Sequence, residues 1–182
     1  MLPERVTLNP ILLRPFTASD APRVELLVGD WEVASMTALI PHPYLPGMAE
    51  AWLAEQRRDR EAGRIHTYAI TRVTDAVLVG AIDLRIGAGG SDSFGYWVGR
   101  PYWGRGYATA ALRALIALAF TYLDVEELQA RHLVRNPASG QVMAKCGLRL
   151  LHREIRDHRG APDEFYVRGI TREAWERVVA AD

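Results

Sequence analysis

The chain has 182 residues, with 22 lysines and arginines, 22 aspartates and glutamates, and no net charge. This balance excludes the broad basic surface that draws a protein to nucleic acid or to an anionic membrane. The longest apolar run, Ala114–Phe120, falls far short of the ~20 residues of a membrane span, and one cysteine, Cys146, excludes an internal disulfide framework. We therefore expect a cytoplasmic protein folded as a single domain over residues 1–182.

In the first half of the chain, helical and β-branched segments alternate between turn signals. Gly29 and Gly63 end two helical segments, and three prolines between residues 41 and 46 exclude regular structure there. The predicted elements are a strand at Ile11–Arg14, helices at Asp20–Val28 and Met48–Ala62 with a helical turn or two in Trp31–Leu39 between them, and a hairpin of strands at His66–Val73 and Val77–Ile86.

The second half contains a strand–helix–strand passage followed by a hairpin. After a hairpin tip at Gly87–Gly90, the predicted elements are strands at Ser93–Val98 and Leu128–Val134 around a helix at Gly106–Leu123, then a helix at Ser139–Lys145, strands at Leu148–Ile155 and Glu164–Thr171 joined across Asp157–Asp163, and a helix at Arg172–Ala180. Such a passage makes its two strands parallel neighbours or near-neighbours. We predict an α/β layered domain around one mostly antiparallel, twisted sheet.

A glycine-rich turn joins the first of these strands to its helix. Gly104 and Gly106 bracket Arg105, so main-chain N–H groups can converge on an anion at the start of the helix. The arginine adds a cation that pairs with phosphate. The turn is not a P-loop, because no Gly-Lys-Ser or Gly-Lys-Thr is present, and Thr109 stands where a dinucleotide-binding loop has its third glycine. Either a plain turn or a diphosphate site for a nucleotide-containing cofactor fits this pattern.

A second motif follows the next predicted strand. Asn136 precedes Pro137 and a short helical segment, which is typical of an N-cap residue with proline at the first helical position. The five histidines show no spacing suited to a metal, so we predict no metal site.

Together these motifs resemble the GNAT superfamily of N-acetyltransferases. Trp103–Ala108 is similar to its acetyl-CoA pyrophosphate loop, [QR]-x-x-G-x-[GA], with tryptophan in place of Gln or Arg. The second GNAT motif is matched by Asn136, Ser139, Lys145, Gly147 and, in place of phenylalanine, Leu148. The resemblance extends from Ile11 to Trp175 and is strongest to the branch that acetylates ribosomal-protein N-termini. It implies a GNAT-like sheet whose two central parallel strands, Ser93–Val98 and Leu128–Val134, splay apart.

The resemblance also implies acetyl-CoA as co-substrate and assigns the residues that bind it. Val98 would polarise the thioester carbonyl through its main-chain N–H, with Trp97 beside it, and Asn136 would bind the amide arm. The diphosphate would be held by the loop residues Gly104, Arg105, Gly106, Tyr107, Ala108 and Thr109. Because GNAT enzymes transfer the acetyl group directly, Cys146 is expected to be a small core residue and not a nucleophile.

The catalytic residues are less directly implied. Many relatives use a tyrosine as general acid at the position of Met143, whose thioether cannot donate a proton. Ser139 is therefore the candidate acid, or it serves only the helix N-terminus. Arg131 occupies the place of a carboxylate base found in some relatives. Asp83 interrupts an apolar strand and is the candidate base, unless it merely lies on the solvent face. Through water, Glu32 or His66 could serve instead.

The predicted function is transfer of an acetyl group to a primary amine, in a pocket walled by Trp31–Tyr44 and the last hairpin. Freeing an α-amino group of its proton at pH 7 costs about 1.4 kcal/mol, against about 4.6 for lysine. A site without an obvious strong base therefore suits an α-amino group, or a polyamine or sugar amine with a lowered pKa, and we predict a peptide N-terminus. An aminoglycoside or polyamine acceptor, or a non-catalytic acyl-CoA-binding module, are the alternatives. A homodimer is also compatible with the resemblance.

Overall fold

One mixed sheet organises the computed structural model, which describes residues 2–87 and 92–180. Within these residues its strands are β1 (Val6–Leu8), β2 (Ile11–Arg14), β3 (Ile65–Arg72), β4 (Leu78–Arg85), β5 (Asp92–Val98), β6 (Glu127–Leu133), β7 (Arg149–His158) and β8 (Ala161–Thr171). Their order across the sheet is β1-β2-β3-β4-β5-β6-β8-β7. Every neighbouring pair is antiparallel except β5 and β6, which confirms the predicted fold class.

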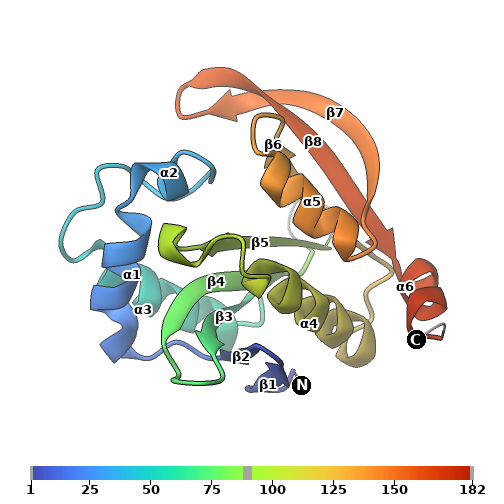
Figure 1. Ribbon diagram of the computed structural model, residues 1–182, viewed down its shortest axis with the longest axis horizontal. Coiled ribbons are helices and arrows are strands. Elements are labelled where there is room, and N and C mark those ends of the chain that lie inside the picture. The colour runs from blue at the N-terminus through green and yellow to red at the C-terminus, as the bar shows by residue number, and fades with distance from the viewer. Residues whose placement is uncertain (1, 88–91, 181–182) are drawn as a thin grey trace.

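Helices cover both faces of this sheet. They are α1 (Ala21–Val28), α2 (Trp31–Ala34), α3 (Met48–Glu61), α4 (Tyr107–Tyr122), α5 (Pro137–Lys145) and α6 (Arg172–Val179). On one face α1 packs on β4 and α3 on β3, while on the other α4 crosses the first strands and α5 continues over β6 (Figure 1). The two faces are therefore lined by different helices, and the site lies where the sheet divides between them.

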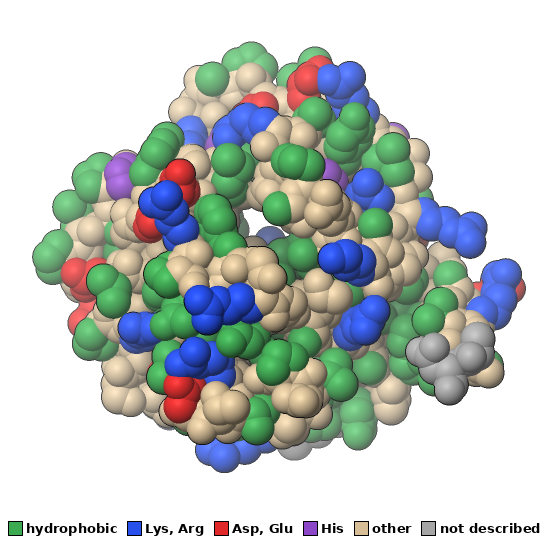
Figure 2. All heavy atoms as spheres, viewed as in Figure 1, with side chains coloured by type: hydrophobic (Ala, Val, Ile, Leu, Met, Phe, Trp, Pro, Cys, Tyr) green, Lys and Arg blue, Asp and Glu red, His purple; other side chains and the backbone are tan. Residues whose placement is uncertain are grey.

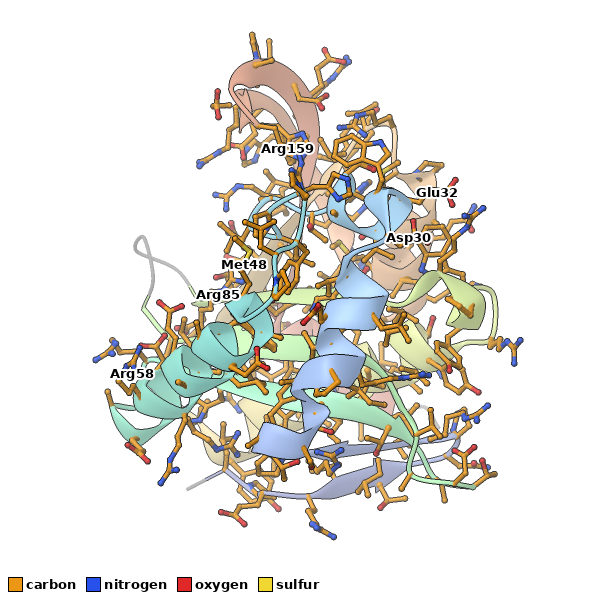
Figure 3. All side chains as sticks on the ribbon, turned by 90° about the vertical axis from the view of Figure 1, so that its left-hand side faces the viewer. Asp30, Glu32, Met48, Arg58, Arg85 and Arg159 are labelled. Carbon is orange, nitrogen blue, oxygen red and sulfur yellow. The ribbon has the colours of Figure 1, made fainter. Side chains whose placement is uncertain are left out.

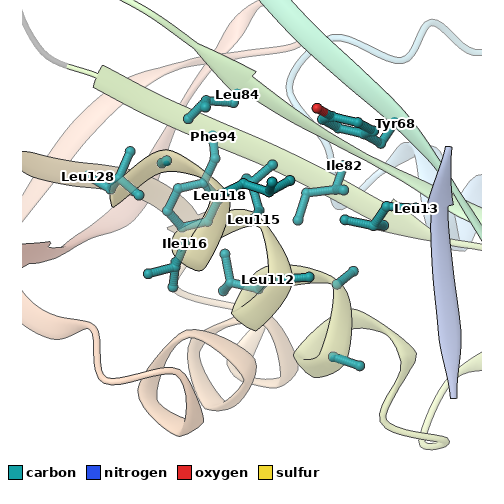
Figure 4. Close-up of a cluster of buried hydrophobic side chains, with 14 of the residues drawn as sticks. Leu13, Tyr68, Ile82, Leu84, Phe94, Leu112, Leu115, Ile116, Leu118 and Leu128 are labelled. Atoms are coloured by element: carbon teal, nitrogen blue, oxygen red, sulfur yellow. The ribbon is translucent and has the colours of Figure 1, made fainter. Parts of the chain in front are cut away.

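The main core lies between the sheet and α4. Ile82 and Phe94 from the strands meet Leu112, Leu115 and Leu118 of the helix (Figure 4). Because α4 is apolar around most of its circumference, it can be buried between the sheet on one side and α5 on the other. This packing fixes the N-terminus of α4, where the glycine-rich loop ends.

Leu115→Ala is expected to lower the free energy of unfolding by about 3 kcal/mol, because Leu115 is fully buried and its truncation leaves a cavity. Leu26→Ala on α1, where 66% of the side chain is exposed, is the matched control and should change stability by less than about 0.5 kcal/mol. Urea unfolding of both variants measures the difference. Equal losses in the two variants would contradict the assigned core.

The N-terminal half contains one strand more than was predicted. The three-residue strand β1 was not predicted, because three residues are too few to show an alternating pattern; it pairs with β2. The prediction of a helical turn or two within Trp31–Leu39 is confirmed by α2, which ends at Ala34. The carbonyls of the residues that follow are bound by side chains from the far end of the chain, so the segment does not continue as a helix.

The predicted last hairpin is confirmed, but its connection is shorter than the predicted Asp157–Asp163. The strands of the last hairpin extend to His158 and from Ala161, and the turn between them consists of Arg159 and Gly160, with φ of 60° and 83°. Two successive positive φ values give the twist that joins antiparallel strands tightly. The turn predicted at Gly87–Gly90 lies mostly outside the described residues.

Candidate active site

The site begins where β5 and β6 separate. The two parallel strands pair only at Asp92 with Leu128 and at Ser93 with Gln129, and beyond these residues they splay apart, as the GNAT resemblance implies. Figure 2 shows an opening that passes through the molecule between the α2–β5 region and α5. A ligand entering from one face can therefore reach a ligand on the other.

The edge of β5 that faces this gap carries main-chain groups directed into it. Gly99 N donates to Val79 O at 2.9 Å, so the amides of Gly99 and Trp97 point toward β4. By alternation the amides of Val98 and Tyr96 point toward the gap. The side chain of Trp97 packs on the α1–α3 face, away from these two residues. The Val98 amide is thus directed toward the position where a thioester carbonyl could accept a hydrogen bond.

The glycine-rich loop forms an open cradle at the N-terminus of α4. Gly104 and Gly106 have φ of 73° and 80°, a region that glycine adopts without strain, and a Cβ at either position would meet no atom within 4 Å. Gly106 is the N-cap of α4, so the amides of Tyr107, Ala108 and Thr109 are those that an α-helix leaves without an internal acceptor. Arg105 is exposed beside them. The geometry fits the predicted diphosphate site.

Trp103 has a role that the sequence did not reveal. Its indole Nε1 donates to the carbonyl oxygen of Val98 at 2.6 Å, which ties the start of the loop to the open edge of β5. The departure from the usual Gln or Arg at this position thus has a structural explanation, because the indole anchors the loop. The ring remains 47% exposed.

The N-terminus of α5 lies on the other side of the gap. Asn136 caps this helix, since its Oδ1 accepts from the amide of Ser139 at 3.2 Å. The Ser139 hydroxyl lies 2.9 Å from the phenol oxygen of Tyr96, which also donates to the Ser139 carbonyl oxygen at 3.2 Å. Tyr96 was absent from the predicted site; only its position in the strand before the loop could have indicated it. The structure therefore brings Ser139, Asn136 and the open edge of β5 together.

Asp83 lies on the opposite face of the sheet. On β4 it stands beside Gly95 of β5, where the missing side chain leaves room for the carboxylate. Its side chain is 19% exposed and forms an ion pair with Arg85, with Nε 2.8 Å from Oδ1. The contact of Oδ1 with Arg85 Nε lacks the alignment of a hydrogen bond, and among the described residues Oδ1 has no other hydrogen-bond partner. Burial raises the pKa of Asp83 above the usual carboxyl range, and the neighbouring Arg85 offsets this only in part. Asp83 therefore does not lie on a solvent face of the strand, which was the alternative to its role as a base.

The other candidate bases lie elsewhere. Glu32 on α2 forms an ion pair with Arg100 and lies well apart from Arg85 (Figure 3). His66 pairs with Leu84 in register, and by alternation it points to the face opposite Asp83. Arg131 forms an ion pair with Glu154. Of these groups, Asp83 alone combines partial burial with a position paired directly to β5, the strand that borders the gap.

Cys146 lies at the end of α5, and its Sγ donates to the carbonyl oxygen of Thr109 at 3.5 Å. Burial raises the pKa of its thiol to about 11, so the nucleophilic thiolate is scarce at neutral pH. This agrees with the expected role as a core residue.

The tip of the last hairpin is bound to α2 and to the segment that follows it. Arg159 donates to the carbonyl oxygens of Ala34, at 2.6 Å, and of Ile40, and its guanidinium lies 5.3 Å from the centroid of the Trp31 ring (Figure 3). Further bonds join Arg135 to the Ser35 carbonyl and His158 to the Thr37 carbonyl. The two segments predicted to wall an acceptor pocket are thus bound to each other.

The charged side chains around the opening are unevenly distributed. On its α4–α5 side, lysine and arginine side chains predominate over acidic ones in Figure 2. This distribution suits a ligand that carries several phosphates, while the chain as a whole has no net charge. None of the helices within residues 2–87 and 92–180 combines the length and apolar character needed to cross a bilayer.

A divided parallel strand pair beside an open, glycine-rich helix N-terminus defines an α/β domain whose gap has the geometry for a diphosphate-bearing cofactor. Comparison with known proteins names the family. The family model of the acetyltransferase (GNAT) domain matches residues 11–149, and the chain belongs to this family.

Individual relatives share less with the chain. The FsC-acetyl coenzyme A-N(2)-transacetylase of Aspergillus fumigatus is 35% identical over 89 residues, which are 47% of this chain. The match spans only 38% of the length of that curated relative. RimL, a ribosomal L7/L12 alpha-N-protein acetyltransferase solved with coenzyme A, has a TM-score of 0.83 and 16% identity, with 94% of this chain and 99% of that chain covered. RimJ of Mycobacterium smegmatis, solved with CoA-disulfide, has a TM-score of 0.76, 25% identity, and coverages of 94% and 88%.

Proposed function

We propose that the protein transfers an acetyl group from acetyl-CoA to a primary amine, and that the acceptor is a protein or peptide N-terminal α-amino group. The observation that carries the proposal is the gap between β5 and β6, with an open anion-binding loop beside it and a partly buried carboxylate on the face opposite Tyr96 and Ser139. Donor and acceptor can meet in this gap from opposite faces of the sheet.

On the donor side, the loop amides of residues 104–109 and the Arg105 guanidinium bind the diphosphate. The Val98 amide donates to the thioester carbonyl, where negative charge develops during the reaction. The Asn136 side chain keeps its amide N–H groups for the pantetheine arm, because only its oxygen is used in capping α5. Acetyl-CoA acts as a co-substrate that leaves as CoA.

On the acceptor side, the neutral amine attacks the thioester carbon, a C–N bond forms and the C–S bond breaks. The Ser139 hydroxyl donates a hydrogen bond to the departing thiolate, which then takes a proton from solvent and leaves as the CoA thiol. The proton lost by the amine passes to Asp83 across a water, because Oδ1 itself is covered. The products are an acetylated amine and CoA.

The acceptor class follows from the cost of supplying a neutral amine. Asp83 is the one base in this proposal. At pH 7, removing the proton from an α-amino group costs about 3 kcal/mol less than removing it from a lysine. The alpha-N-protein acetyltransferase named among the similar structures supports this class. The match to a transacetylase named for an N(2) amine favours a small-molecule amine as the second candidate.

A panel of amines tests the proposal by release of the CoA thiol. The decisive pair is a short peptide with a free α-amino group and the same peptide acetylated at its N-terminus but carrying an internal lysine. We expect kcat/KM at least about tenfold higher for the first, as the two amine pKa values require. Faster turnover of spermidine or an aminoglycoside would show that the acceptor is a small amine and not a peptide N-terminus. Tight acetyl-CoA binding without turnover of any amine would identify a binding module and overturn the proposal.

A further inference from the structure

Ser139 is held at three of its atoms. Its amide N–H is bound by Asn136, and both its carbonyl oxygen and its hydroxyl lie within hydrogen-bond distance of the Tyr96 phenol, at 3.2 and 2.9 Å. Asn136 and Ser139 belong to the start of α5, whereas Tyr96 comes from β5, beyond the last paired residue of the splayed strands. The phenol therefore spans the gap and sets the distance between β5 and α5.

The hydrogen atoms of this pair can be arranged in two ways. When the phenol hydrogen points to the Ser139 carbonyl, the serine hydrogen can point back to the phenol oxygen. When the phenol hydrogen points to Ser139 Oγ instead, the serine hydrogen is free for a third acceptor. Both arrangements use atoms already in place, so a change between them needs rotation of two hydroxyl hydrogens and no movement of heavy atoms.

The surroundings keep the phenol in its protonated form. Tyr96 is partly buried beside Phe94, 6.4 Å between ring centroids, and this burial raises its pKa above the usual tyrosine range. The phenol thus retains its hydrogen throughout the pH range in which an amine is acetylated. One helical turn further along α5, Met143 is buried and has no hydrogen to donate.

Resting on the function proposed above, we propose that Tyr96 is a positioning residue for acetyl transfer: its phenol donates to Ser139 Oγ and so directs the serine hydrogen to the departing sulfur. Tyr96 acts through Ser139 and not on the substrate itself. The Tyr96–Ser139 pair contributes one hydroxyl from β5 and one from α5. Together they take the place of the single tyrosine that many GNAT relatives carry at the position of Met143.

A double-mutant cycle tests this inference. Tyr96→Phe should lower kcat about tenfold with the KM for acetyl-CoA unchanged, Ser139→Ala should lower kcat at least as much, and the double variant should be no slower than Ser139→Ala alone. Tyr68→Phe is the matched control. It removes a buried phenol on the same face of the sheet, bonded at 2.9 Å to the Pro3 carbonyl, and should leave kcat unchanged.

The outcomes are distinguishable. Unchanged kcat in Tyr96→Phe, or losses that multiply in the double variant, would overturn the positioning role while the proposed function stands. Absence of turnover in the unaltered protein would overturn the proposed function itself. If Tyr96→Phe did not fold, 3-fluorotyrosine at position 96 keeps the shape and strengthens the donor. A changed kcat at constant KM then supports the role, and an unchanged kcat overturns it.

Discussion

Gly106→Glu is expected to weaken acetyl-CoA binding by at least about 100-fold, since the glutamate places a negative charge where the loop and the helix dipole favour an anion. A Cβ at Gly106 meets no atom within 4 Å, so the side chain can be accommodated without a clash. Isothermal titration with acetyl-CoA measures the loss, and circular dichroism checks that the variant is folded.

Gly63→Glu provides a matched control for strain and charge. Gly63 follows α3, has φ of 70°, and its Cβ would likewise meet no atom within 4 Å. Both variants pay a similar cost of about 1 kcal/mol for a side chain in the left-handed region, but only one adds charge beside the loop. Unaltered affinity in Gly106→Glu, or an equal loss in Gly63→Glu, would refute the diphosphate assignment.

Local sequence signals were sufficient for most of the fold. The strand Ile11–Arg14 was predicted with the bounds that the structure shows, and α4 and α5 begin within two residues of their predicted starts. These elements are bounded by proline, glycine or a capping asparagine, which act on the backbone locally. The positions of the strands in the sheet were harder to predict. The separation of β5 from β6 depends on contacts between distant segments, and only the family resemblance implied it.

The parts of the site that were missed share one property: they are contacts between residues far apart in the chain. Tyr96 and Ser139 are 43 positions apart, and nothing near either residue indicates the other. Arg159 binds carbonyls more than a hundred positions away. A hairpin across Asp157–Asp163 was predicted, but nothing in the sequence indicated that Arg159 would bind main-chain oxygens of a distant segment. Side-chain chemistry was visible in the sequence, but the partners were not.

Asp83→Asn is expected to lower kcat about 100-fold or more, because the amide cannot accept the proton of the attacking amine. Burial raises the pKa of Asp83, so the base form appears only above the usual carboxyl range. In the unaltered protein kcat should rise with pH through that raised pKa, and in Asp83→Asn this acidic limb should be lost. A pH–rate profile with a saturating peptide acceptor measures both effects, and a preserved limb would assign the base elsewhere.

The pH dependence of stability gives an independent check on Asp83. Its contribution has the opposite sign from that of most ion-paired carboxylates. Because the folded state holds the Asp83 proton more tightly than the unfolded chain, this group makes the free energy of unfolding fall as pH rises from ~3.9 through its raised pKa. Asp83→Asn should lack that component. Asp20→Asn, which breaks the buried Asp20 pair with Arg14, 2.8 Å from Nη2 to Oδ1, is the control: it should lower stability yet preserve kcat and its pH limb. A loss of kcat in both variants would mean that removing any buried carboxylate disturbs the site, and that Asp83 is not the base.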